Sequence, residues 1–286
     1  MHIIIGGTGN VGSALSKALL EKGESVTIVT HDPSKARDRQ QKGLQVALAD
    51  VHDLDALRRV FRQGKRLFLL NPPADPSTDT DAEERKSLAS ILAALDGSGL
   101  EKVVAESTYG AQPGDRIGDL GILYEMEQAL EAQPIPASII RAAYYLSNWD
   151  LETAKKEGVV HTMYPADFEL PMVAPHDIGQ LAARLMTEPV ERTGLYYVEG
   201  PELYSPSDVA AAFAAALKRP VEAVVTPREQ WTLAFKAMGF SEMAAYSYAE
   251  MTAITLDKRY SLPDAPVRGD TSLQNYVNRL VRNDAA

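Results

Sequence analysis

The chain has 286 residues and no cysteine, which excludes disulfides, thiolate nucleophiles and cysteine-bound metal sites. Its formal net charge of -10 argues against general binding to nucleic acid or to anionic membrane surfaces. The apolar start is broken at once by glycines and no apolar run is long enough to span a membrane, so we expect a cytoplasmic protein without a resident metal.

Roughly the first 140 residues alternate between short apolar runs and longer segments of helical spacing. Continuous apolar strands separated by helices indicate a parallel sheet covered on both faces, with right-handed crossovers. We therefore expect an α/β fold with a Rossmann-type doubly wound parallel sheet. The predicted strands are His2–Ile5, Ser25–Thr30, Gln45–Ala49, Arg66–Leu70, Lys102–Glu106 and Ala137–Ile140, and the predicted helices include Val11–Lys22, Leu54–Phe61, Ala82–Leu95 and Tyr124–Glu131.

The rhythm changes after about residue 150. Strands are predicted over Gly158–Tyr164, Pro171–Ala174, Gly194–Glu199 and Pro220–Thr226, and helices over His176–Thr187, from Ser205 to Leu217 and from Thr226-Pro227 onward. The aromatic and methionine-rich region Trp231–Met251 is interpreted as core, part of which forms an adaptable lid. We expect a dinucleotide-binding domain over residues 1–155 and, over residues 156–286, mostly a smaller C-terminal substrate lobe with segments that complete the sheet.

A glycine-rich turn, Gly6-Gly7-Thr8-Gly9-Asn10-Val11-Gly12, follows the first strand directly and leads into a helix. Glycines at this spacing permit a tight turn, a close approach of the backbone to a pyrophosphate, and close packing of helix on strand. The helix N-terminus adds free N–H groups and a favourable dipole. The context favours dinucleotide binding over a purely structural turn. The residues predicted to hold the cofactor here are Gly6, Thr8, Gly9, Asn10, Val11 and Gly12.

The end of the second strand, Thr30-His31-Asp32-Pro33-Ser34-Lys35, has no carboxylate directly where an NAD-binding site would place one. We expect His31 and Lys35 to bind a 2′-phosphate, which favours NADP(H) over NAD(H). The alternative is that Asp32 only caps the following helix and Lys35 is solvated. After the third strand, Asp50 with Val51 either contacts adenine or Asp50 caps the next helix.

Strand ends further along the chain supply the remaining candidates. Asn71 and Pro72 are predicted beside the cofactor ribose, with Pro73 toward the substrate, although this stretch is equally typical of an ordinary loop. Ser107 and Thr108 are predicted to bind the cofactor. Tyr109 is predicted to serve as a weak acid or to form a wall of the pocket on which the ligand stacks. An aromatic cluster then suits a flat conjugated ligand, or else joins the two lobes as core. Its members are Tyr144, Tyr145, Asn148 and Trp149.

The sequence resembles the short-chain dehydrogenase superfamily, whose chemistry usually needs a Tyr-x-x-x-Lys pair. None of the twelve tyrosines has a lysine four residues later, so that proton relay is absent. The segments that fit instead resemble the NmrA-like family of atypical members. They are the glycine turn, His31-Asp32-Pro33-Ser34-Lys35-Ala36, Tyr124–Leu130 with Glu127, Ile139–Tyr145 with Arg141, Val173–Ile178 and Tyr197-Val198-Glu199-Gly200.

This resemblance implies one of two functions. Some members are NADPH-dependent reductases of quinones, azo dyes or triphenylmethane dyes, which need no tyrosine–lysine acid; others are redox sensors that regulate a protein partner without catalysis. Reductases of the family carry Arg where His31 stands, and many relatives carry Lys where Leu123 stands. We interpret Glu127 and Arg141 as a structural pair. The expected ligand is a small aromatic or quinone-like substrate, with no nucleic acid or membrane partner and with a homodimer possible.

Overall fold

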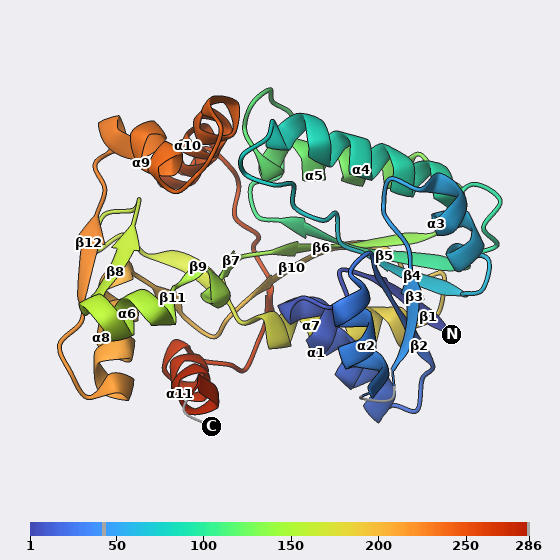
Figure 1. The fold of residues 1–286 in the computed structure, drawn as a ribbon, viewed down its shortest axis with the longest axis horizontal. Coiled ribbons are helices and arrows are strands. Elements are labelled where there is room, and N and C mark those ends of the chain that lie inside the picture. The colour runs from blue at the N-terminus through green and yellow to red at the C-terminus, as the bar shows by residue number, and fades with distance from the viewer. Residues whose placement is uncertain (42–43, 285–286) are drawn as a thin grey trace.

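The computed structural model describes residues 1–41 and 44–284. An eight-stranded, fully parallel sheet forms its centre, in the order β13-β10-β6-β5-β4-β1-β2-β3 (Figure 1). The sheet therefore confirms the expected α/β class. Its strands are β1 (His2–Ile5), β2 (Val26–Thr30), β3 (Gln45–Leu48), β4 (Arg66–Leu69), β5 (Lys102–Thr108), β6 (Ala137–Ala142), β10 (Gly194–Glu199) and β13 (Val267–Arg268).

Helices cover both faces of this sheet (Figure 1). One face carries α1 (Asn10–Glu21), α2 (Pro33–Gln41) and α7 (Pro175–Thr187); the other carries α3 (Leu54–Phe61), α4 (Thr80–Leu95) and α5 (Asp119–Glu131). The central strands are buried on both faces, which explains their continuous apolar sequences. Gly179 lets α7 approach α1 closely, because an added Cβ would lie 2.7 Å from the Ala14 Cβ.

A smaller lobe stands beyond the carboxyl end of the sheet (Figure 1). It has a three-stranded sheet, in the order β11-β9-β7, and a parallel pair of β8 and β12. The strands are β7 (Tyr144–Tyr145), β8 (Val159–Thr162), β9 (Leu170–Val173), β11 (Leu203–Tyr204) and β12 (Glu222–Val225). The helices are α6 (Leu151–Glu157), α8 (Pro206–Leu217), α9 (Trp231–Ala237), α10 (Glu242–Leu256) and α11 (Leu273–Asp284), with short 3-10 turns at Leu146–Asn148 and Arg228–Gln230.

Several elements differ from the prediction. Helix α5 begins at Asp119, five residues before the predicted Tyr124, immediately after Gly118 with its positive φ of 55°. Strand β5 runs to Thr108, so Ser107 and Thr108 lie within the strand rather than beyond it. Helices α10 and α11 and strand β13 were not individually predicted. No helix within residues 1–41 and 44–284 is long and apolar enough to cross a membrane.

Candidate active site

Neighbouring strands β1, β4, β5 and β6 end at the same edge of the sheet, where a cavity of about 380 Å³ opens between the sheet and the smaller lobe. Parallel sheets place their ligand sites at this edge. Eight of the predicted site residues line the cavity: Asn71, Pro73, Ser107, Thr108, Tyr109, Tyr144, Tyr145 and Asn148. The structure adds residues that were not predicted to do so, among them Leu70, Glu106, Leu120, Leu123, Tyr164, Met251, Thr255 and Tyr260.

The glycine turn borders this cavity. Gly6 has a φ of 76°, which favours glycine, and an added Cβ there would lie 3.2 Å from Leu70, one of the lining residues. A Cβ on Gly12 would lie only 2.3 Å from the Gly6 carbonyl oxygen, so this position requires glycine for packing of the helix on the turn. Two of the three spaced glycines are therefore explained by the fold alone.

Gly9 is not explained by the fold. Its φ of -80° and ψ of -177° are extended values open to any residue, and an added Cβ would meet nothing closer than the Gly6 oxygen at 3.4 Å. Gly9 is the N-cap of α1, and no side chain among the described residues caps that helix. A glycine with room around it, before a helix start that lacks a side-chain cap, fits a backbone that must approach a pyrophosphate closely.

At the predicted ribose end, His31 and Lys35 are both exposed beside the start of α2. Asp32 caps this helix, because its Oδ1 accepts hydrogen bonds from the backbone N–H groups of Ser34 and Lys35. The third strand is followed by Asp50, whose Oδ1 accepts from the His52 N–H. Asp53, rather than Asp50, caps α3, so the capping alternative for Asp50 is wrong.

A second basic residue, which the sequence did not single out, reaches the turn. Arg39 lies in the last turn of α2, and its Nη2 donates to the Thr8 carbonyl oxygen and to Ser13 Oγ, each at 3.1 Å. The guanidinium thus joins the end of α2 to the glycine turn and the first turn of α1. A dinucleotide bound over the turn would place its adenosine ribose in this region.

A buried network joins β5, α5, β6 and β10. Glu127 accepts two hydrogen bonds from Arg141, at 2.8 and 2.6 Å, and one from Ser107 Oγ at 2.5 Å. Arg141 also donates to the Tyr197 hydroxyl at 3.0 Å. This confirms the predicted structural pair of Glu127 and Arg141. Because Ser107 Oγ is held by the pair, the network fixes the end of β5 where it meets the cavity.

Tyr109 follows the end of β5 and is almost fully buried. Its hydroxyl donates to Glu199 Oε2 at 2.9 Å, and Glu199 is paired on its other oxygen with Arg268. Burial, and then the negative charge of Glu199, raise the pKa of the Tyr109 hydroxyl far above its ordinary value. The Tyr109 hydroxyl is therefore engaged with a carboxylate and is a poor acid, while its ring lines the cavity.

Glu106 and Tyr145 form a second acid pair, and both side chains line the cavity. The Tyr145 hydroxyl donates to Glu106 Oε1, and Glu106 Oε2 is buried with no partner among the described residues. Burial raises the pKa of Glu106 to about 7, although the hydrogen bond from Tyr145 opposes the rise. Sequence reasoning missed Glu106 because a single carboxylate at a strand end gives no spacing signal.

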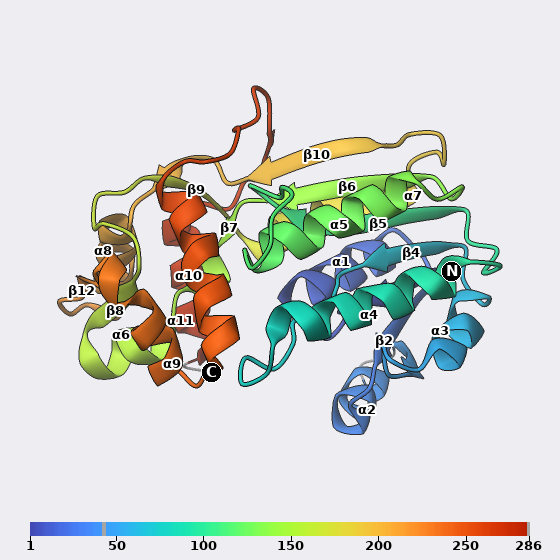
Figure 2. The ribbon, with the colours of Figure 1, turned by 90° about the horizontal axis from the view of Figure 1, so that it is seen from above.

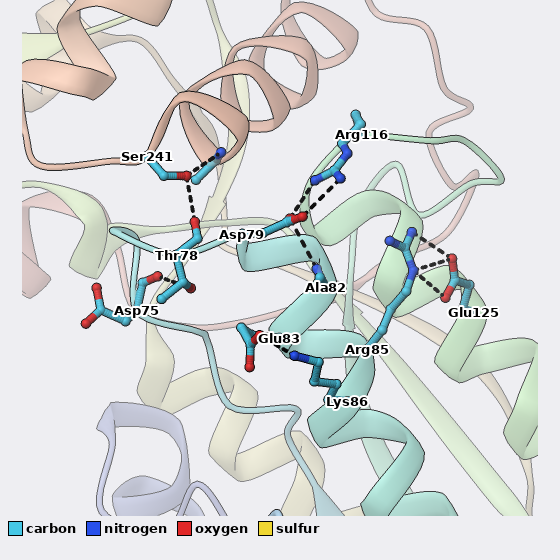
Figure 3. A network of polar contacts seen from close by, with 11 residues as sticks. Asp75, Thr78, Asp79, Ala82, Glu83, Arg85, Lys86, Arg116, Glu125 and Ser241 are labelled. Atoms are coloured by element: carbon cyan, nitrogen blue, oxygen red, sulfur yellow. Dashed lines mark hydrogen bonds and ion pairs between the residues drawn. The ribbon is translucent and has the colours of Figure 1, made fainter.

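The loop between β4 and α4 carries Asn71, Pro72 and Pro73. Asn71 Nδ2 donates to the Glu84 carbonyl oxygen at 3.2 Å, whereas its Oδ1 is buried and has no partner among the described residues. Further along, the loop is bound to the smaller lobe: Ser241 Oγ, at the start of α10, donates to the Thr78 carbonyl oxygen at 2.6 Å (Figure 3). The loop is therefore held from both sides of the cavity.

The residues of the predicted aromatic cluster lie in two different places. Tyr144 and Tyr145 reach the cavity, whereas Trp149 packs in the core of the smaller lobe, with its ring centre 5.9 Å from that of Tyr144. Tyr164 and Tyr260 take up cavity positions that the sequence had not indicated. Both come from segments beyond β7, and only the folding of the smaller lobe brings them to the edge of the sheet.

Comparisons with known proteins agree on the family and the fold. The model of the NmrA-like family matches residues 2–262. An NAD(P)H azoreductase of Xenophilus azovorans is 24% identical over 256 residues, which cover 89% of this chain and 87% of that protein.

Two solved structures have the same fold. The triphenylmethane reductase of Citrobacter sp. complexed with NADP(H) superposes with a TM-score of 0.77, at 16% identity, over 98% of this chain and 99% of that one. The quinone oxidoreductase QOR2 of Escherichia coli complexed with NADPH gives a TM-score of 0.75, at 20% identity and the same coverage.

Proposed function

Because the chain belongs to the NmrA-like family, we propose that it is an NAD(P)H-dependent oxidoreductase that transfers hydride to an electron-poor conjugated acceptor of the quinone, azo or triphenylmethane type. The observation that carries this proposal is the aromatic cavity near the glycine turn, since Leu70 lines the cavity and lies 3.2 Å from the position that a Cβ on Gly6 would take. With the pyrophosphate over the turn, the nicotinamide would extend toward the cavity and face a flat acceptor between tyrosine rings. The names of the related azo, quinone and dye reductases support the same class.

Such a reaction suits the side chains available. An acceptor of this type is activated by its own electron deficiency, so the protein has chiefly to hold the two rings face to face and exclude water. The cavity offers tyrosine rings and apolar side chains for that purpose, including Tyr144, Tyr164 and Met251. Its floor is fixed by the network of Glu127 and Arg141.

We propose NADPH as the preferred cofactor. Arg39 supports this preference more directly than His31, because its guanidinium already reaches the glycine turn and carries a permanent positive charge. A 2′-phosphate in that position would gain charge-assisted hydrogen bonds from Arg39, and Lys35 lies on the same helix. No carboxylate projects from the strand end itself, since Asp32 is engaged in capping α2.

The deciding experiment is the oxidation of NADPH and NADH with a panel containing a quinone, an azo dye and a triphenylmethane dye. Acceptor-dependent oxidation that is faster with NADPH is the expected result. Gly9→Ala is the matched variant: its Cβ has room in the protein, so the fold should be retained while cofactor affinity falls at least about tenfold, or about 1.4 kcal/mol. Tight binding of NADPH with no oxidation by any acceptor would instead support the redox-sensor function.

A further inference from the structure

We propose that Tyr145 delivers the proton that the reduced acceptor needs and that Glu106 resupplies Tyr145, so that a tyrosine–carboxyl pair replaces the missing tyrosine–lysine pair. This inference rests on the proposed reductase function. Here Tyr145 touches the acceptor and is the catalytic residue, whereas Glu106 acts through Tyr145 and is a positioning and proton-holding residue.

The geometry of the pair carries the inference. Glu106 comes from β5 and Tyr145 from β7, and their hydrogen bond joins two strands of different sheets across the wall of one cavity. Glu106 is only 4% exposed. An ionised carboxylate oxygen with no partner is costly in such a place, and a protonated carboxyl is not. The unpartnered Oε2 is thus a place where a proton is held.

The charges around the cavity show why a proton donor is needed there. The lining residues, all within the described chain, include no lysine, arginine or histidine. A quinone that gained only a hydride would be an anion in a cavity whose lining side chains offer no cation to hold it, so a proton donor in the lining would stabilise the product. Tyr145 and Tyr109 both line the cavity, and each hydroxyl donates to a carboxyl group. The partner of Tyr109, Glu199, is ion-paired with Arg268, whereas Glu106 has no basic partner among the described residues. Tyr145 is therefore the hydroxyl placed to serve as acid.

The step balances as follows. The hydride comes from the reduced nicotinamide when it is bound, and a C=O π bond of the quinone breaks. The quinone oxygen forms an O–H bond as the O–H bond of Tyr145 breaks. The Glu106 carboxyl group then rotates so that its protonated oxygen faces Tyr145, and the phenolate takes that proton. Water then reprotonates Glu106. The acceptor has gained one hydride and one proton, and the pair has returned to its starting state.

Other ionisable groups bear on the pair. Asp119, at the start of α5, adds to the charge of Glu106 in raising the pKa of Tyr145, after burial as the main cause. Tyr144, Tyr164 and Tyr260 share the cavity, and burial is the main cause that raises the pKa of each of them. Glu106 is therefore the group on the cavity wall that titrates near neutral pH, with a pKa of about 7.

Two kinds of acceptor separate a proton relay from a structural role. A quinone needs a hydride and a proton, whereas a cationic triphenylmethane dye becomes a neutral product on gaining the hydride alone. In Tyr145→Phe and Glu106→Gln, kcat for the quinone should fall about 100-fold, within the range of general acid catalysis, while kcat for the dye stays within about twofold of wild type. Tyr276→Phe, in the core of the smaller lobe, is the control and should leave both unchanged.

The dependence on pH gives a second readout. With a quinone, kcat of the wild type should fall as the pH rises through about 7, because only protonated Glu106 can resupply Tyr145. Glu106→Gln should lose that step. In the cofactor-free protein, difference infrared spectra should show the carbonyl bands of protonated carboxyls, and the band that disappears near pH 7 should be missing from Glu106→Gln and present in Glu84→Gln.

Each remaining result decides the matter. Equal losses with both acceptors, or unchanged quinone turnover in Tyr145→Phe, would overturn the relay. So would a protein that reduces the dye but no quinone, or a band titrating near pH 7 that survives in Glu106→Gln. If the dye is not reduced, the pH profile and the infrared band decide alone. A wild type that reduces no acceptor would overturn the proposed function itself, and that outcome is distinct from all of these.

Discussion

Arg39 shows how one side chain can connect two segments that a cofactor would bridge. It spans from the last turn of α2 to Thr8 in the glycine turn and Ser13 in α1. These are the two sides of the region in which an adenosine ribose would lie. The side chain is thereby ordered before any phosphate arrives, which lowers the entropy that binding must overcome.

Replacing Arg39 by Ala should therefore change cofactor choice. We expect the affinity for NADPH to fall about 10- to 100-fold, the size expected for a charge-assisted hydrogen bond to phosphate, and the affinity for NADH to change much less. Calorimetric titration of both dinucleotides measures this, with Arg37→Ala on the exposed face of the same helix as control. Equal losses for both cofactors would mean that Arg39 only braces the turn.

Three carboxylates lie close together at α4 and α5: Asp81 and Glu84 are buried, and Asp119 is half-buried. Burial, and then the charge of Asp119, raise the pKa of Glu84 to about 8, and burial also raises the pKa of Asp119. Neither oxygen of Asp81 has a partner among the described residues. Glu84 does have a hydrogen-bond partner, since its Oε1 accepts from the Ala74 N–H at 3.0 Å.

The Glu84 carboxyl makes stability depend on pH. In the unfolded chain Glu84 ionises near its ordinary pKa of 4.5, while in the folded protein it keeps its proton to about pH 8. The contribution of Glu84 to the free energy of unfolding is thus complete below pH 4.5 and is lost as the pH rises toward about 8. Glu84→Gln keeps the acceptor for Ala74 and should raise the free energy of unfolding at about pH 8 by on the order of 2 kcal/mol.

Denaturant unfolding at acidic and at mildly basic pH tests this expectation. The gain should be confined to the basic side and should be absent near pH 4.5. Glu83→Gln is the matched control, because Glu83 pairs with Lys86 at the surface of the same helix. A gain of equal size at both pH values, or a loss at basic pH, would contradict the assignment.

At the scale of elements, α10 is the helix that closes the cavity. It lies against α4 and contributes Met251 and Thr255 to the lining (Figure 2). Its N-cap Ser241 accepts from the Ala244 N–H and donates to the Thr78 carbonyl oxygen, while Arg116 binds Asp79 at the start of α4 (Figure 3). A single hydroxyl therefore caps the helix and joins it to the loop after β4.

The variant Ser241→Ala should show that Ser241 binds the loop after β4 in addition to capping α10. We expect a loss of about 1 to 2 kcal/mol in the free energy of unfolding and faster amide hydrogen exchange over residues 74–79 and the first turn of α10. Ser205→Ala removes the cap of α8 and should lower stability without changing exchange over residues 74–79. Exchange over residues 74–79 that is identical in both variants would contradict the role of Ser241 as a tie.

The same helix shows why some elements could not be predicted. The glycine turn and the apolar strands carry local signals, so β1 to β6 were predicted almost in full. Helix α10 has no apolar stripe, because it is packed on several sides and buries residues as varied as Ala245, Ser247 and Thr252. Strand β13 has two residues and exists only through its pairing with β10.

The candidate site divides in the same way. Residues next to strand ends, such as Asn71 and Tyr145, could be placed at the cavity because parallel strands end together. Arg39 and Tyr260 could not, since tertiary packing alone brings them to the turn or the cavity. Glu106 lies at a strand end, but a single carboxylate there gives no spacing signal. Trp149 shows the opposite error: it was predicted at the cavity because it is close in sequence to residues that line it, but it packs in the core of the smaller lobe.

At the scale of the whole molecule, charge should sort the acceptors. The chain carries a formal net charge of -10, and its cavity holds Glu106 and several tyrosine rings but no lining cation. Tyrosine faces attract cations, and a field of one sign enriches the opposite ion at the cavity. A cationic dye should therefore be bound in preference to a sulfonated one.

Steady-state kinetics with a matched pair of dyes, one cationic and one sulfonated, would measure this. We expect KM for the sulfonated dye to be at least about tenfold higher, and the difference to shrink as salt is added, because screening weakens attraction and repulsion alike. A neutral quinone serves as the control and should show little dependence on salt. Tighter binding of the sulfonated dye would contradict the expectation.

The chain crosses repeatedly between the large sheet and the smaller lobe. It leaves after β6, returns with α7 and β10, leaves again for β11, returns as β13 and ends as α11 beside α8. The two lobes are thus connected by several crossings of the chain rather than by one linker, and neither lobe is formed by a single continuous segment. They should melt in one cooperative transition. Access to the cavity must then come from local movement of α10 and its neighbouring loops, since a swing of one lobe away from the other would have to bend every crossing at once.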